Sequence, residues 1–223
     1  MEELQREPSV PHKRHGRTTA QWWDETRASE ARLVDWLQRQ FHGEAYAVSL
    51  MNHFLALYED DIEPWVKPNF EFIVKQEALH AKWVGQLLVR RGVQPKMLEK
   101  KERYWGEVRH KIRSFDTYCA AIHLVENMAL AKDVAISGHD KTPPDVHEVF
   151  RRLKVDETFH AGFYGLVAKP EALEEMWVHH RRGMDAIGLV DSDESRRAWV
   201  MPTAQPKLTA AELAALRMRS TQA

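Results

Sequence analysis

Two Glu-x-x-His pairs, each matched to a glutamate farther upstream, restrict the folds open to this chain. The pairs are Glu77/His80 and Glu157/His160, and the upstream glutamates are Glu44 and Glu126. Each upstream glutamate stands in an apolar run with helical periodicity, and a carboxylate buried in such surroundings is costly without a cation or a hydrogen-bond donor. An i, i+3 spacing also places each paired glutamate and histidine on one face of a helix. The pattern predicts a fold that gathers these six side chains around metal ions.

Prolines, glycines and polar breaks divide the sequence into helical runs. From Thr18 to about Asp60 no proline interrupts the apolar positions, which recur every three or four residues and predict one long helix. A break follows over 60–64. Further helices are expected over 68–92, 115–137, 145–168 and 171–184, with a charged connection over 93–113 that contains a helical piece. Thr209 and Glu212 have the spacing of a capping box and predict a last short helix.

The spacing within each helical hairpin tests the metal-site hypothesis. In an antiparallel helix pair, residues equally far from the turn lie at the same height. The midpoint between Glu44 and the first Glu-x-x-His pair falls near position 61, inside the turn over 60–64. The midpoint between Glu126 and the second pair falls near position 142, inside the turn over 139–144. Both hairpins therefore place a lone glutamate level with a pair, and face-to-face packing gives the oxygen and nitrogen set that suits iron or manganese.

Composition sets the broad class. With 223 residues, 43% of them hydrophobic, the chain can bury one substantial core, and we expect an N-terminal arm (1–17), a helical domain (18–184) and a polar C-terminal tail with a short helix (185–223). The 32 basic and 33 acidic residues nearly balance, which argues against nucleic acid or a membrane surface as a partner. A single cysteine excludes an internal disulfide framework. The absence of a secretion signal or a long apolar stretch favours the cytoplasm.

The six residues resemble the ligand set of the ferritin-like di-iron carboxylate proteins, over residues 18–170. This resemblance implies an all-α, four-helix bundle with a long crossover between its second and third helices, which 93–113 would supply. It also implies two irons bridged by Glu77 and Glu157. Glu44 and His80 would complete the coordination of one iron, and Glu126 and His160 that of the other. The metals in this superfamily react with dioxygen or peroxide.

Asp156 favours one branch of that superfamily. Together with the second pair it forms Asp-Glu-x-x-His, which is similar to the motif of di-iron monooxygenases and of the radical-generating subunit of ribonucleotide reductase. The resemblance implies that Asp156 accepts a hydrogen bond from the ring N–H of His80. Gln76 stands at the corresponding place in the first motif, and its lack of charge would make the two irons unequal. The alternative is that Asp156 is a solvated residue on a helix edge.

Two further side chains share the faces of the predicted ligands. Tyr164 follows His160 by one helical turn, and it is either a core tyrosine near the metal or a redox-active or proton-donating group. His123 precedes Glu126 by three residues, and it is either a hydrogen-bond donor behind the ligands or an alternative ligand.

These features favour a non-haem di-iron oxygenase or oxidase that uses dioxygen to hydroxylate, N-oxygenate, desaturate or cleave a small organic substrate. Two iron ions are expected, with manganese or a mixed iron and manganese pair as alternatives, together with an external electron donor such as a ferredoxin-like protein or a reductase. A homodimer is compatible with the sequence.

The alternatives are a ferroxidase or iron-storage protein, although storage subunits are shorter and build cages, and a peroxide reductase of the rubrerythrin type. Rubrerythrins usually carry a module with two Cys-x-x-Cys pairs, which one cysteine cannot supply. A purely structural bundle is a fourth alternative.

Overall fold

The chain folds into α-helices. The computed structural model describes residues 16–99, 103–189 and 208–221, and within these ranges it contains no strand, which confirms the predicted all-α class. The four long helices are α2 (Glu30–Leu57), α3 (Val66–Arg90), α5 (Phe115–Gly138) and α6 (Pro144–Val167). The shorter ones are α1 (Thr19–Thr26), α4 (Tyr104–Val108), α7 (Pro170–Ile187) and α9 (Ala210–Ser220), with 3-10 turns η1 (Glu59–Asp61) and η2 (Arg109–Lys111). None of these helices is long and apolar enough to cross a membrane.

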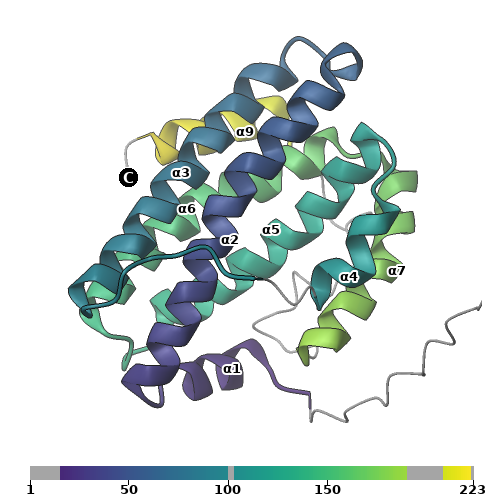
Figure 1. Cartoon of the computed structure of the whole chain (residues 1–223). Coiled ribbons are helices and arrows are strands. Elements are labelled where there is room, and N and C mark those ends of the chain that lie inside the picture. The colour runs from purple at the N-terminus through teal and green to yellow at the C-terminus, as the bar shows by residue number, and fades with distance from the viewer. Residues whose placement is uncertain (1–15, 100–102, 190–207, 222–223) are drawn as a thin grey trace, which may run out of the picture.

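The long helices form two antiparallel hairpins, α2–α3 and α5–α6, which meet where α3 packs against α6 (Figure 1). The short helices cover the outside: α7 lies on α5, α4 lies on α7, and α9 lies on α6. Among the described residues, α2 and α5 meet at one end, where the rings of Phe54 and Tyr118 stack with centroids 4.2 Å apart, and their backbones otherwise stay apart. The two hairpins are therefore closed along α3 and α6 and leave a seam between α2 and α5.

Local signals explain where the helices begin and end. Ser114 caps α5 and forms a capping box with Thr117, and Pro144 occupies the first turn of α6, where its missing N–H costs nothing. The predicted capping box of Thr209 and Glu212 is confirmed at the start of α9. Gly188 ends α7 with a positive φ of 74°, a conformation that L side chains rarely adopt.

The expectation of one helix from 18 to 60 is wrong, because the chain breaks between α1 and α2. Ser29 starts α2 by accepting a hydrogen bond from the N–H of Arg32 at 3.4 Å. A straight helix would carry the preceding residues past the end of α3. The break instead turns α1 back, so that Trp23 is fully buried against Trp36, with ring centroids 5.3 Å apart. The indole N–H of Trp23 also donates to Thr142 at 2.8 Å, and burial of so large a side chain outweighs the continuity of the helix.

The terminal segments are only partly described. Residues 1–15 of the predicted arm lie outside the described residues. Residues 190–207 and 222–223 of the predicted tail also lie outside them. The described end of the tail, α9, packs on α6, where Leu213 is buried and approaches Gly162 together with Leu216. The C-terminal helix therefore contributes to the packing around the long helices.

Candidate metal centre

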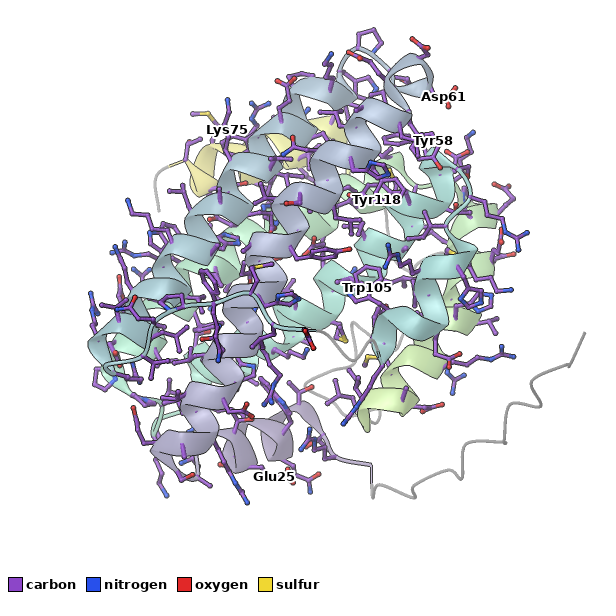
Figure 2. The ribbon with its side chains drawn as sticks, viewed as in Figure 1. Glu25, Tyr58, Asp61, Lys75, Trp105 and Tyr118 are labelled. Carbon is purple, nitrogen blue, oxygen red and sulfur yellow. The ribbon has the colours of Figure 1, made fainter. Side chains whose placement is uncertain are left out.

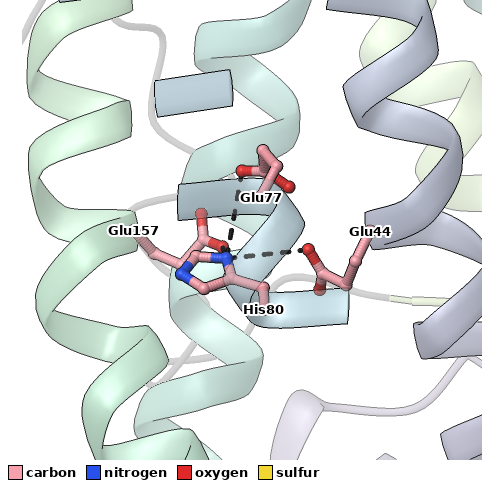
Figure 3. Close-up of side chains that lie close together, drawn as sticks. All are labelled: Glu44, Glu77, His80 and Glu157. Carbon is pink, nitrogen blue, oxygen red and sulfur yellow. Dashed lines mark ion pairs between the residues drawn. The ribbon is translucent and has the colours of Figure 1, made fainter. Parts of the chain in front are cut away.

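All six predicted ligands meet in the interior between the two hairpins. Helix α2 supplies Glu44, α3 supplies Glu77 and His80, α5 supplies Glu126, and α6 supplies Glu157 and His160. Each has at most 6% of its surface exposed, and both histidines are fully buried. The carboxylates of Glu44, Glu77 and Glu157 surround the ring of His80 in Figure 3. In each hairpin, the lone glutamate and the Glu-x-x-His pair are equally far from the turn. They therefore lie at the same height along the bundle, as the sequence predicts.

The ligand atoms form two overlapping groups. One group contains Glu44, Glu77, His80 and Glu157, and the other contains Glu77, Glu126, Glu157 and His160; in each, one ligand atom per residue lies within 4.8 Å of the others. Glu77 and Glu157 belong to both groups. These two carboxylates are therefore the ones placed to reach both groups.

The distances between ligand atoms fit shared ions. From Nδ1 of His80, the nearest carboxylate oxygens of Glu157, Glu44 and Glu77 lie at 3.4, 3.7 and 4.0 Å. From Nδ1 of His160, those of Glu77 and Glu157 lie at 3.1 and 3.5 Å. Oxygen and nitrogen atoms bound about 2.1 Å from one ion in octahedral geometry lie about 3.0 Å apart when adjacent and about 4.2 Å apart when opposite. The observed separations fall within that range.

Hydrogen bonds on the outer side of the rings fix the histidine tautomers. Nε2 of His80 lies 3.0 Å from Oδ2 of Asp156, and a carboxylate can only accept, so Nε2 carries the proton. Nε2 of His160 lies 3.0 Å from Oε1 of Gln76. Neither Nδ1 atom has a hydrogen-bond partner in the described structure. Both Nδ1 lone pairs are therefore directed at the carboxylates, which is unfavourable unless a proton or a cation lies between them.

Ser220, at the end of α9, joins these two outer hydrogen bonds. Its hydroxyl donates to Oδ1 of Asp156 and accepts from the amide nitrogen of Gln76. Because the amide N–H₂ of Gln76 faces Ser220, its Oε1 faces the N–H of His160. A continuous chain of hydrogen bonds thus runs from His80 to His160. No local pattern in the sequence indicates Ser220, because the packing of α9 on α6 brings it to this place.

Burial and crowding of like charges shift the pKa values of the site. Burial, reinforced by the charges of neighbouring glutamates, raises the pKa of Glu77 and of Glu126. Burial also acts to raise the pKa of Glu157, but the imidazole of His160 outweighs it and holds that pKa well below its usual range. Burial disfavours a charged His80, yet its acidic neighbours, Asp156 first, raise its pKa. Burial and like charge therefore favour protonation of Glu77 and Glu126, whereas the imidazole of His160 favours the ionised form of Glu157.

A seventh buried acid, Asp133, lies near the ligands and was missed from the sequence. It is 3% exposed, and its Oδ2 has no hydrogen-bond partner in the described structure. Burial, together with the charges of Glu157 and Glu44, raises its pKa. The signal that would have found it is its position seven residues, or about two turns, after Glu126 on the same face of α5.

The two additional candidates from the sequence lie beside the site. Tyr164 is fully buried, and its ring packs edge-on against that of Tyr118, with ring centroids 6.3 Å apart. Neither hydroxyl makes a hydrogen bond of ordinary geometry. Burial raises the pKa of both phenols. His123 belongs to neither ligand group, and its Nδ1 lies 2.8 Å from the carbonyl oxygen of Ala161, as an N–H donor would. It links α5 to α6, and its ring packs over Gly165.

A cavity opens onto the candidate centre along the seam between α2 and α5. Its volume is about 180 Å³, and four of the six ligands form part of its wall: Glu44, Glu77, Glu126 and Glu157. Most of the remaining wall is apolar or aromatic, including Ala47, Met51, Tyr118, Ile122 and Ala129. Asp133 and Lys132 add two ionisable groups. The carboxylate side of the centre is therefore the side that a small molecule can reach.

Comparisons with protein-family models, with curated proteins and with solved structures found no match to this chain.

Proposed function

We propose that the protein is a di-iron oxygenase or oxidase built on a ferritin-like four-helix bundle, acting on a small organic substrate. The observation that carries the proposal is the pair of overlapping ligand groups sharing Glu77 and Glu157. Two Nδ1 lone pairs and a cluster of carboxylates directed at the same small space suit two divalent cations with mixed oxygen and nitrogen ligands. Iron is the metal we favour, and manganese or a mixed pair accepts the same ligands.

Each ligand has a defined task in this proposal. Glu44 and His80 would hold one ion, Glu126 and His160 the other, and Glu77 and Glu157 both; this is the arrangement in which the ligand atoms meet. The negative charge of four glutamates would offset the charge of two divalent ions. The metal pair would supply the ability to bind and reduce dioxygen.

The surrounding residues support such chemistry. Asp156 and Gln76 hold the two imidazoles in the tautomer that presents Nδ1. One partner is an anion and the other is neutral, so His80 would be the more electron-rich ligand and the two ions would differ. Asp133, whose pKa burial raises, places a further acidic group in the cavity wall. The mostly apolar lining lowers the polarity of the surroundings of the carboxylates.

The cavity favours oxidation of an organic substrate over iron storage or peroxide reduction. An engineered apolar cavity of about 150 Å³ holds benzene, and the space beside the four glutamates measures about 180 Å³. An iron-handling site needs only a path for ions and has no use for an apolar chamber. Electrons would come from an external donor, since the described residues contain one cysteine, which is buried.

Oxygen uptake by iron-loaded protein tests the proposal. Protein reconstituted with ferrous iron is expected to consume dioxygen and to develop a charge-transfer band in the near-ultraviolet to visible range. Glu77→Ala should abolish both, whereas Glu71→Ala, which removes an exposed glutamate from the same helix, should leave both unchanged. Uptake that persists in Glu77→Ala would contradict the proposal. Hundreds of irons per particle with a cage-sized assembly would point to storage instead.

A further inference from the structure

The cavity beside the candidate metal centre continues into a larger cleft. The cleft has a volume of about 740 Å³ and shares six lining residues with the cavity: Trp36, Gln40, Trp105, Val125, Met128 and Lys132. The shared residues come from α2, α4 and α5, so the two spaces adjoin at the seam between α2 and α5. In Figure 2, Trp105 and Tyr118 are labelled on this side of the molecule. The cleft therefore adjoins the space beside the carboxylates of the centre.

Lys132 stands where the two spaces meet. It is the one cationic side chain in the described wall of the cavity, and its ammonium lies 5.6 Å from the ring centre of Trp22. No carboxylate of the described residues forms an ion pair with it. Burial lowers the pKa of Lys132 to about 8, which shows that its charge is poorly solvated. Among the described residues, the ammonium group thus has no carboxylate within ion-pair distance.

The acids nearest to Lys132 are poor counterions for it. Asp133 attracts Lys132 through space, but no ion pair joins the two side chains. The charge of Glu44 attracts Lys132 through space, but a cation bound to Glu44 would offset that attraction. Within the described part of the chain, Lys132 is therefore available to pair with a bound anion.

The wall of the cleft is mainly positively charged, as Lys132 is. Its described wall contains Arg17, Arg39, Arg103 and Lys132 but only one acid, Glu99. Arg17 and Arg39 have partners at its edge, Glu25 and Asp35. A cleft lined mainly by one sign of charge raises the local concentration of ligands of the opposite sign.

We propose that the substrate is a small organic acid whose apolar body fills the cavity and whose carboxylate pairs with Lys132. This inference rests on the proposed function, because it names the substrate class of the same site. A single compact ammonium group matches a monoanion, whereas a phosphate dianion usually recruits several donors or an arginine fork. The cavity volume limits the apolar body to about the size of one six-membered ring or a short alkyl chain.

Ligands that differ only in their head group test this assignment. Metal-loaded protein is titrated with 3-phenylpropionate, 3-phenylpropanol and 3-phenylpropylamine, and with alkanoates and alkanols of four to eight carbons. The emission of the tryptophans in the wall, Trp36 and Trp105, reports binding. The acids are expected to bind about tenfold more tightly than the matched alcohols, as for one charge-assisted hydrogen bond away from bulk water, and the amine most weakly.

Matched variants assign the preference to one side chain. Lys132→Met should remove the preference for acids while leaving the affinity for alcohols, and Lys132→Arg should retain it. Lys75→Met, which removes an exposed lysine from α3, should behave as wild type. Circular dichroism verifies that each variant is folded. Equal binding of all head groups, no binding of any acid, or a preference that survives Lys132→Met would overturn the proposal.

Oxygen uptake measured on the same samples separates this inference from the proposed function. Acid-selective binding that depends on Lys132, in protein that takes up no dioxygen, supports the acid site and contradicts the oxygenase. Uptake of dioxygen by protein that binds acids and alcohols equally contradicts the acid site alone.

Discussion

Nε2 of His80 and Oδ2 of Asp156 lie 3.0 Å apart, on side chains from α3 and α6 that are both buried. The bond crosses between the two hairpins, at the pair of long helices that closes the interior. It presents the opposite ring nitrogen, Nδ1, to the carboxylates, and it raises the pKa of His80 against the effect of burial. One contact thus positions a ligand, sets its tautomer and increases its basicity.

Removal of this carboxylate should weaken metal binding. Asp156→Ala is expected to lower metal affinity about 10- to 100-fold, because the imidazole of His80 loses both its orientation and the anion that makes it a stronger donor. Competition with a chelator of known affinity measures the change. Asp140→Ala, at an exposed aspartate after α5, is the matched control. An affinity equal to wild type in Asp156→Ala would remove Asp156 from the centre.

Loss of the Ser220 hydroxyl should affect both histidines at once. In Ser220→Ala, the amide of Gln76 and Oδ1 of Asp156 both lose a partner. Metal affinity should fall about fivefold, as expected for the loss of about 1 kcal/mol. Spectra of the metal-loaded protein should show both ions perturbed, whereas Thr221→Ala, which removes the neighbouring exposed hydroxyl, should leave the spectra unchanged. Spectra identical to wild type in Ser220→Ala would show that α9 does not influence the centre.

The stabilising effect of metal should grow with pH. Glu77, Glu126 and Asp133 have raised pKa values in the folded protein, so folded metal-free protein binds more protons than unfolded protein above about pH 4, and its stability falls as pH rises. The raised pKa of His80 acts in the same direction above its unfolded value. Glu157 acts in the opposite direction, since its lowered pKa contributes stability that is lost on acidification.

Metal binding requires these groups to be deprotonated. The stability of the metal-loaded protein should therefore fall much less with rising pH than that of the metal-free protein. Thermal unfolding between about pH 5 and pH 8 should show a metal-free midpoint that declines and a difference between the two forms that widens. A difference that shrinks as pH rises would contradict the assignment of these acids to a cation site.

His123 should matter for stability and not for metal content. His123→Ala removes the hydrogen bond to the carbonyl oxygen of Ala161 and the packing of the ring over Gly165. The two losses together should cost about 1 to 3 kcal/mol in chemical denaturation. The number of bound ions should equal that of wild type. Loss of one ion in this variant would instead establish His123 as an alternative ligand.

The sequence predicted the centre better than the packing around it. Glu44 and Glu126 were found because a helical hairpin converts equal spacing about a turn into equal height, a relation that needs no tertiary information. The break before Ser29 was missed, since it depends on the burial of Trp23 against side chains from distant parts of the chain. Ser220 was missed for the same reason. Local patterns fix which face of a helix is buried, whereas contacts between remote segments depend on how the helices pack.

The number of ions lost from single ligand variants tests the central claim most directly. After anaerobic loading with ferrous iron and removal of free metal, wild-type protein should retain two ions per chain. Glu44→Ala, which removes a ligand from one group only, should retain about one ion, and Glu157→Ala, which removes a ligand common to both groups, should retain less than one. One ion or fewer in the wild type, or two ions in Glu157→Ala, would contradict a two-metal centre bridged by shared glutamates.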